Sequence, residues 1–173
     1  AFTYSHLYHL ATTGLRFFTV YGPWGRPDMA YFLYTRAILE GRSIQVFNHG
    51  DMARDFTYID DIIGGIVRVV DQPAGPARDT NEGNDTERVP YKLYNIGNSS
   101  PVQLNDFIGA IEKKLGIKAV REYLPLQPGD VIRTEADISE LARDLGYAPS
   151  VNLEEGIDRF IDWYLPFYGK VHQ

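Results

Sequence analysis

Two arginines in this sequence follow turns at which a ligand could bind. Arg26 comes after an apolar run, residues 15–20, that ends in a glycine-proline turn. Arg54 comes after a flexible turn formed by residues 50–53. An arginine offers a planar fork of hydrogen-bond donors that fits phosphate and carboxylate oxygens, a geometry that lysine lacks. These two positions are therefore the first candidates for binding an anionic ligand.

The apolar run before Arg26 is typical of a strand that is covered on both faces, as in a parallel sheet. Pro23 has no N–H and Gly22 permits turn dihedrals, so the chain has to leave the sheet at this point. Ligands of open α/β sheets bind outside the carboxyl ends of the strands, and Arg26 and Thr19 lie at that edge. The sequence thus predicts a ligand site at the carboxyl end of this strand.

Composition excludes several classes of partner. A chain of 173 residues can bury a core, as one domain or as one half of a larger one. Its formal charge of −6 argues against a nucleic-acid binder, because phosphate backbones attract basic surfaces. No apolar stretch approaches the ~18–20 residues of a membrane span, and the absence of cysteine excludes disulfides and thiolate zinc sites. We therefore expect neither a nucleic-acid nor a membrane partner.

No metal site is expected, because the histidines lack metal-binding spacing, and we assign them no catalytic role. They are His6, His9, His49 and His172.

Periodicity and turn residues predict alternating helices and strands. Helices are expected over residues 1–10, 29–40, 60–70 and 103–115, with two more beginning at Asp137 and Asn152, the last ending near Pro166. Strands are expected over residues 15–20, 43–47, 54–58, 91–96 and 118–124, with a solvent-exposed loop over residues 71–90. The buried face of the third helix is predicted to hold Ile62, Ile63, Ile66, Val67 and Val70.

Four segments in order resemble the C-terminal half of an extended short-chain dehydrogenase/reductase, and within that superfamily they are closest to the UDP-glucuronate 4-epimerases. The segments are LRFFTVYGPWGRPDMA, NHGDMARDFTYIDDI, YNIGNSSPVQL and LQPGDV. The resemblance implies an α/β fold, the C-terminal part of a Rossmann-type enzyme with a smaller α/β substrate-binding domain. Residues 1–30 would end the Rossmann-like sheet and carry the sugar loop, and residues 31–173 would supply mostly substrate-binding elements.

The sequence departs from this family in one respect. The family's glycine-rich dinucleotide loop and its Tyr-x-x-x-Lys pair come earlier in the chain, and neither is present here, since none of the 12 tyrosines has a lysine four residues on. We therefore expect the N-terminal dinucleotide-binding part and all catalytic residues to be absent from this chain. The alternative is a small independent domain with a native N-terminal helix.

The resemblance implies roles at the nucleotide end of a site. Arg54 would contact a diphosphate, Phe47 would stack on a nucleobase whose edge is read by the backbone near Val46, and Asp130 would accept hydrogen bonds from ribose hydroxyls. Each residue also has a structural explanation. Arg54 could pair with Asp55 or another carboxylate, Phe47 could belong to the core, and Asp130 could cap a helix or form a turn.

At the sugar end, the resemblance implies that Thr19 and Arg26 hold the carboxylate of a uronic acid by charge-assisted hydrogen bonds. Arg26 could instead cap a helix or pair with Asp28. Phe17 and Phe18 fall where the family's strand passes the nicotinamide ring, although core packing explains them equally well.

The resemblance also implies a function for the whole protein. It would bind NAD, mainly through the absent part, and invert C4 of UDP-glucuronate to give UDP-galacturonate, as a cytoplasmic homodimer. The isolated fragment would be inactive. There are two alternatives. One is another NAD-dependent nucleotide-sugar epimerase, dehydratase or decarboxylase, and the other is a non-catalytic UDP-sugar binding module.

Overall fold

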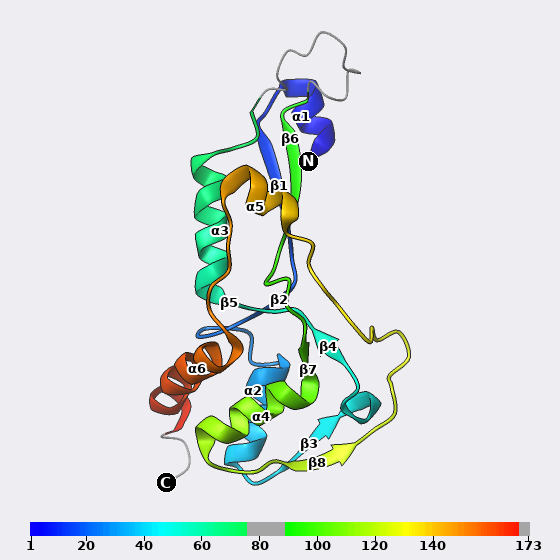
Figure 1. Cartoon of the computed structure of the whole chain (residues 1–173), viewed down its shortest axis with the longest axis vertical. Helices are drawn as coiled ribbons and strands as arrows, with labels where there is room; N and C mark the ends of the chain where they lie inside the picture. The colour runs from blue at the N-terminus through cyan, green and yellow to red at the C-terminus, as the bar shows by residue number, and fades with distance from the viewer. Residues whose placement is uncertain (76–88, 170–173) are drawn as a thin grey trace.

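The structure, a computed structural model, describes residues 1–75 and 89–169 (Figure 1). The helices are α1 (Phe2–Tyr8), α2 (Ala30–Leu39), α3 (Ile59–Asp71), α4 (Leu104–Leu115), α5 (Ser139–Leu145) and α6 (Leu153–Tyr168), with a 3-10 turn η1 (Phe47–Gly50). The strands are β1 (Thr12–Phe17), β2 (Thr19–Tyr21), β3 (Ser43–Val46), β4 (Ala53–Arg54), β5 (Phe56–Tyr58), β6 (Tyr91–Ile96), β7 (Val102–Gln103) and β8 (Val120–Tyr123).

The strand predicted over residues 15–20 is divided at Phe18, where it changes its partner. Up to Phe17, β1 lies parallel to β6. The Phe18 N–H then donates to the Ile96 carbonyl (3.2 Å), and the next N–H, that of Thr19, donates to the Asp55 carbonyl (3.2 Å). From there β2 runs parallel to β5. The change of partner places Thr19 beside Asp55.

The described elements enclose two hydrophobic cores (Figure 1). The smaller core lies between β1, β6, α3 and α5, and the larger one lies among α2, α4 and α6. Strands β2 and β5 run between them in the middle of Figure 1. Tyr21 of β2 is at the centre of the larger core, with its ring centroid 5.6–6.2 Å from four other rings. These rings belong to Tyr31, Phe56, Tyr58 and Phe107.

A fully buried carboxylate, that of Asp55, joins three segments of the chain. Its Oδ1 accepts the Asn98 N–H at 2.8 Å, and its Oδ2 accepts the N–H groups of Ser99 at 2.9 Å and Ala136 at 2.8 Å. A Cβ added at Gly97 would lie 2.5 Å from the Ala136 Cβ and 3.2 Å from Asp55 Oδ2. The glycine therefore lets the loop after β6 close tightly around the carboxylate.

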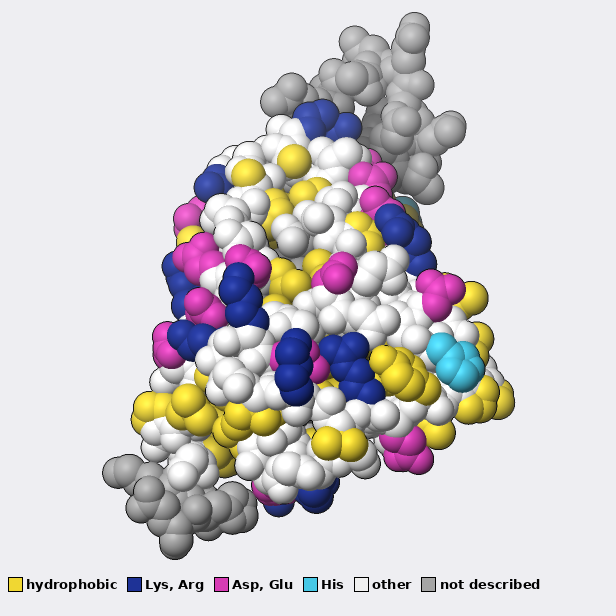
Figure 2. Space-filling model, turned by 60° about the horizontal axis from the view of Figure 1, so that its bottom comes forward, with side chains coloured by type: hydrophobic (Ala, Val, Ile, Leu, Met, Phe, Trp, Pro, Cys, Tyr) yellow, Lys and Arg dark blue, Asp and Glu magenta, His cyan; other side chains and the backbone are white. Residues whose placement is uncertain are grey.

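Charges of both signs alternate at the end of the molecule formed by α2, α4, β3 and β8. This end comes forward in Figure 2, where Lys and Arg side chains lie next to Asp and Glu side chains. Two ion pairs connect α4 to α6, with Lys113 Nζ 3.0 Å from Glu154 Oε1 and Lys114 Nζ 2.9 Å from Asp162 Oδ1. Within the described ranges, no helix is long and apolar enough to cross a bilayer.

Several sequence predictions are confirmed at the level of single residues. Phe107, Ile108 and Ile111 of α4 are buried as expected. The Asn152 side chain accepts the Glu155 N–H at 2.9 Å and caps α6. Asp137 accepts the Ser139 N–H at 3.0 Å, although α5 begins only at that serine.

Helix α6 ends at Tyr168, near Pro166 as expected. One prediction is wrong. On α3, Ile62 is buried, but Ile63, Val67 and Val70 are 50%, 51% and 71% exposed.

The reason for the α3 error is the position of the helix on the smaller core. A Cβ at Gly65 would lie 2.5 Å from Ile96 and 3.0 Å from Tyr147, so the Gly65 side of the helix faces the core. The neighbouring apolar side faces outward from the described residues. Residues 76–88 of the predicted loop and His172 lie outside the described ranges.

We expect replacement of Asp55 by Asn to lower the free energy of unfolding by roughly 2–4 kcal/mol, measured by urea denaturation. The substitution keeps the shape of the side chain but replaces an acceptor oxygen with an NH₂ group, so at least one buried backbone N–H loses its partner at a cost of ~1–3 kcal/mol, and a charge-assisted network is weakened. Asp71→Asn, at an exposed position at the end of α3, is the control and should change stability by less than about 0.5 kcal/mol. Equal effects of the two substitutions would contradict the role of Asp55.

Candidate functional site

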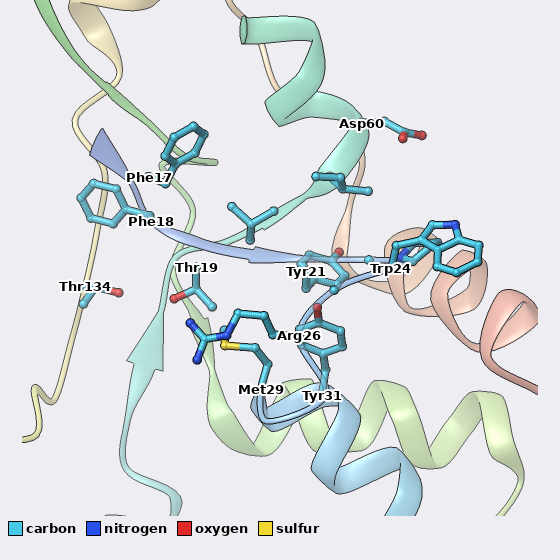
Figure 3. A pocket seen from close by; sticks show the side chains of 15 residues that line it. Phe17, Phe18, Thr19, Tyr21, Trp24, Arg26, Met29, Tyr31, Asp60 and Thr134 are labelled. Atoms are coloured by element: carbon cyan, nitrogen blue, oxygen red, sulfur yellow. The ribbon is translucent and has the colours of Figure 1, made fainter. Parts of the chain in front are cut away.

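A cavity of about 950 Å³ runs along β2 and reaches the loop beyond its carboxyl end (Figure 3). Four of the residues predicted to form the site line it, namely Phe17, Phe18, Thr19 and Arg26. In Figure 3 the two phenylalanines lie at one end of β2 and Trp24 lies at the other. The strand that the sequence predicted to end in a ligand site therefore does end in a large cavity.

A second cavity of about 270 Å³ shares two lining residues with the first and is lined by the other charged candidates. Phe47, Arg54 and Asp130 line it, and Thr19 and Met29 line both cavities. Residues that are far apart in the sequence thus line two cavities that have Thr19 and Met29 in common. Of the predicted substrate-binding residues, Val46 lines neither cavity.

Arg54 forms its ion pair with Asp130. Its Nη2 donates to Asp130 Oδ1 at 2.8 Å, and its Nη1 donates to the carbonyls of Ala53 and Ile132, both at 3.1 Å. Asp130 Oδ1 also accepts the Val131 N–H at 2.8 Å, which is the turn role considered as an alternative for this residue. Among the described residues, the Arg54 Nε–H has no hydrogen-bond partner. The guanidinium is therefore fixed on one side and able to donate on another.

Phe47 is half-buried and stands at the start of the turn η1. Val46, the residue before it, is fully buried and its carbonyl accepts the Leu124 N–H at 3.0 Å. The pairing of β3 with β8 therefore already occupies this part of the Val46 backbone. That this backbone reads a base edge stays a prediction.

Arg26 pairs with Asp28, the alternative that the sequence left open. Nε donates to Oδ1 at 3.0 Å and Nη2 donates to Oδ2 at 2.5 Å. The hydrogen bond from Arg26 holds the pKa of Asp28 below its usual range. Both side chains are exposed, and exposed ion pairs contribute little to stability. A ligand carboxylate could therefore take the place of Asp28.

The loop that carries Arg26 is held by two aromatic residues that sequence reasoning missed. Trp24 has a left-handed φ of 61° and packs against α6, with centroid distances of 5.2 Å to Trp163 and 5.0 Å to Phe167. A Cβ added at Gly25 would lie 1.7 Å from the Tyr31 hydroxyl oxygen. Gly22, Pro23 and Gly25, which surround Trp24, were the signals in the sequence that the backbone is constrained here.

The buried phenols of the larger cavity are unsuited to act as a base. Burial raises the pKa of Tyr31 to about 12, although a backbone hydrogen bond at Gly22 opposes the shift. Burial also raises the pKa of Tyr21, and the nearby Tyr58 and Asp61 add to the effect. Both phenols are therefore protonated at neutral pH. The described residues contain no cluster of three or more side chains that could hold a metal ion.

Comparison with known proteins shows to which family this chain is similar. The model of the NAD dependent epimerase/dehydratase family matches residues 1–97. The chain is 53% identical over 173 residues to Protein CapI of Staphylococcus aureus, covering 98% of this chain and 52% of that protein. It is 47% identical over 173 residues to UDP-glucuronate 4-epimerase 2 of Arabidopsis thaliana, covering 97% of this chain and 39% of that protein.

A solved structure is similar over the same extent. The crystal structure of UDP-glucuronic acid 4-epimerase from Bacillus cereus, in complex with UDP-glucuronic acid and NAD, matches 96% of this chain and 49% of its own length, with a TM-score of 0.80 and 34% identity. This match confirms the predicted fold class, the α/β fold of the extended short-chain dehydrogenases. The chain spans about half the length of this structure and of CapI, and less of the plant enzyme.

We expect Gly25→Ala to destabilise the chain by about 1–3 kcal/mol in thermal or urea unfolding, because the added methyl group overlaps the Tyr31 hydroxyl. Removing that hydroxyl by Tyr31→Phe should reduce the cost of Gly25→Ala in the double variant. The control is Gly64→Ala in α3, where an added Cβ meets nothing within 4 Å and should be neutral or stabilising by up to about 1 kcal/mol. Equal costs of Gly25→Ala with and without the Tyr31 hydroxyl would contradict the contact.

Proposed function

The chain belongs to the NAD dependent epimerase/dehydratase family, and from this we propose that it is the nucleotide-sugar-binding part of an enzyme that interconverts UDP-glucuronate and UDP-galacturonate at C4. The observation that supports this most directly is the pair of cavities that share Thr19 and Met29 in their linings. One contains Arg26, and the other contains Arg54 and Asp130. A ligand with two separate anionic groups would occupy both.

The larger cavity would hold the sugar. A uronic acid carries a carboxylate that a guanidinium can bind by two parallel hydrogen bonds, as Arg26 already binds Asp28. The Thr19 hydroxyl lines the same cavity and could donate to the same carboxylate. An unmodified hexose offers no such charge. The proposal of UDP-glucuronate over other UDP-sugars therefore depends on these two residues.

The smaller cavity would hold the nucleotide. Arg54 is anchored to Asp130 and to two carbonyls, so its remaining N–H groups are fixed in direction before a diphosphate arrives. Asp130, held by Arg54 and by the Val131 N–H, would accept a ribose hydroxyl. Phe47 offers an aromatic surface in the same cavity against which a nucleobase could stack.

The residues at the opposite end of the larger cavity fit a flat cofactor ring. Phe17 is 52% exposed, an unusual position for an apolar ring, and lines the cavity with Phe18. NAD, when bound, would accept a hydride from C4 of the sugar and return it. The two rings would exclude water from that exchange. The division of the chain at residue 30, homodimerisation of the whole protein and a cytoplasmic location stay predictions from the resemblance.

The chain should bind UDP-glucuronate more tightly than UDP-glucose, and Arg26→Ala should remove the difference. We expect this substitution to weaken UDP-glucuronate binding by about 10- to 100-fold, the value of a charged hydrogen-bonded contact, in isothermal titration calorimetry. Binding of UDP and UDP-glucose should change by less than about twofold.

The control is Arg42→Ala, which removes an exposed arginine that pairs with Glu40 and lines neither cavity. It should leave all three affinities unchanged. Equal loss for all three ligands on Arg26→Ala would remove the carboxylate role. Failure of the unaltered chain to bind any of them would remove the proposed function itself.

The purified chain with NAD should not epimerise UDP-glucuronate above the buffer blank. It lacks a Tyr-x-x-x-Lys pair, and the tyrosines of its larger cavity are protonated at neutral pH. The measurement is the appearance of UDP-galacturonate by chromatography, with a full-length epimerase as the positive control. Sustained turnover would show that this chain contains a catalytic base of its own.

A further inference from the structure

The turn η1, which carries Phe47 into the smaller cavity, is strained. Two successive residues, Asn48 and His49, have φ values of 48° and 53°, in the left-handed region that favours glycine. Such conformations cost of order ~1–3 kcal/mol each and persist only when surrounding contacts hold them. The turn therefore needs support from outside.

Part of the support is local. The Asn48 side chain donates to the Asp51 carbonyl at 2.7 Å, and the Asp51 N–H donates back to the Asn48 carbonyl at 2.9 Å. The His49 N–H donates to the Leu124 carbonyl at 3.2 Å, beyond the end of β8. These bonds close the turn but do not fix it against α4.

The contact with α4 comes from Asn105. Its Nδ2 donates to the carbonyl of the buried Gly50 at 3.4 Å. A Cβ added at Gly50 would lie 2.3 Å from that same nitrogen, so the amide is packed directly against the backbone of the turn. In Figure 1 the turn lies to one side of β3, near β8 and β4. Asn105 is therefore the side chain that joins α4 to the end of the turn.

The Asn105 amide is itself oriented by an ion pair whose carboxylate is buried. Arg121 donates from Nη1 to Asn105 Oδ1 at 3.0 Å and from Nη2 to Glu112 Oε1 at 2.9 Å. The Glu112 side chain is only 3% exposed. It also accepts from Lys118 Nζ at 2.7 Å and from the Ala119 N–H at 3.1 Å.

These contacts decide which end of the amide faces the turn. With the Oδ1 of Asn105 taken by Arg121, the Nδ2 has to point at Gly50. Burial by itself would raise the pKa of Glu112, but the hydrogen bonds from Lys118, Arg121 and Ala119 outweigh it and lower the pKa to about 2. The carboxylate is therefore charged at neutral pH and holds Arg121 in place. A buried, fully bonded charge pair of this kind fixes geometry, because moving either partner leaves the other unpaired.

We propose that Asn105 is a positioning residue for the nucleobase: its amide, oriented by Arg121 and Glu112, holds the strained turn that presents Phe47 to the smaller cavity. Asn105 does not line that cavity and acts only through the turn. The inference rests on the proposed function, because it requires Phe47 to be the ring on which the base stacks.

The test is a thermodynamic cycle for UDP binding by calorimetry. It uses the unaltered chain, Phe47→Leu, Asn105→Asp and the double variant. Loss of a stacking ring is worth ~1–3 kcal/mol per base, so Phe47→Leu should weaken UDP binding by about tenfold. Asn105→Asp places an oxygen against the Gly50 carbonyl and should weaken it by about five- to tenfold. In the double variant the two effects should not add, because without the ring the position of the turn no longer matters.

Asp106→Asn is the matched control, since Asp106 is the next residue of α4 and is exposed. It should change the affinity by less than about twofold. Arg121→Lys, which keeps the charge beside Glu112 but loses the fork that holds Asn105, should show the same non-additivity with Phe47→Leu. Thermal unfolding of each variant establishes whether it is folded. If Asn105→Asp is not folded, Arg121→Lys takes its place in the cycle.

The outcomes separate this inference from the proposed function. If the unaltered chain does not bind UDP, the proposed function fails and the inference fails with it. If UDP binds but Phe47→Leu has no effect, Phe47 is not the stacking ring and the inference is overturned. If Phe47→Leu weakens binding while Asn105→Asp has no effect, or has the same effect in both backgrounds, the proposed function survives and the positioning role does not.

Discussion

The buried carboxylate of Asp55 is the interaction on which the arrangement of the site depends. It accepts hydrogen bonds from three backbone N–H groups, which belong to the loop after β6 and to the segment before α5 and take no part in strand pairing. A carboxylate has enough lone pairs to accept all of them. Because Arg54 is the preceding residue and the Thr19 N–H binds the Asp55 carbonyl, both inherit their positions from this anchor. The same carboxylate therefore fixes residues in both cavities.

The site keeps its two cations paired with carboxylates of its own. The Arg26–Asp28 pair is exposed, where ion pairs are weak, so a ligand carboxylate can compete for Arg26 with little loss of stability. Arg54 is bound to Asp130 and to two carbonyls, keeps these bonds, and can donate from its remaining N–H. The Glu112 network is different, since its carboxylate is buried and bound by several donors. The exposed Arg26 can therefore exchange its partner, whereas Arg54 and Arg121, each bound by several groups, are held in place.

The site lies where the two cores meet. Strand β2 ends between them, with the smaller core on one side and the ring cluster around Tyr21 on the other. Rigid elements therefore approach the cavities from both sides, while the ligand-facing loop carrying Arg26 is pinned by Trp24 on α6 and by Tyr31 on α2. The cavities are therefore bordered by rigid elements and by a loop that is constrained at two points. Such an arrangement is suitable for binding a long ligand in a defined orientation.

The sequence by itself determined the elements, the family and which residues could meet a ligand, because helix periodicity, caps such as Asn152 and motif spacing are local properties of the chain. Only the tertiary structure decided which of these residues meet each other. Arg54 pairs with Asp130, a partner 76 residues away, and not with the neighbouring Asp55. The apolar pattern of α3 likewise included residues such as Val67 that the packing leaves exposed. Hydrophobicity and charge state what a side chain can bind, whereas the contact it makes depends on how distant elements pack against one another.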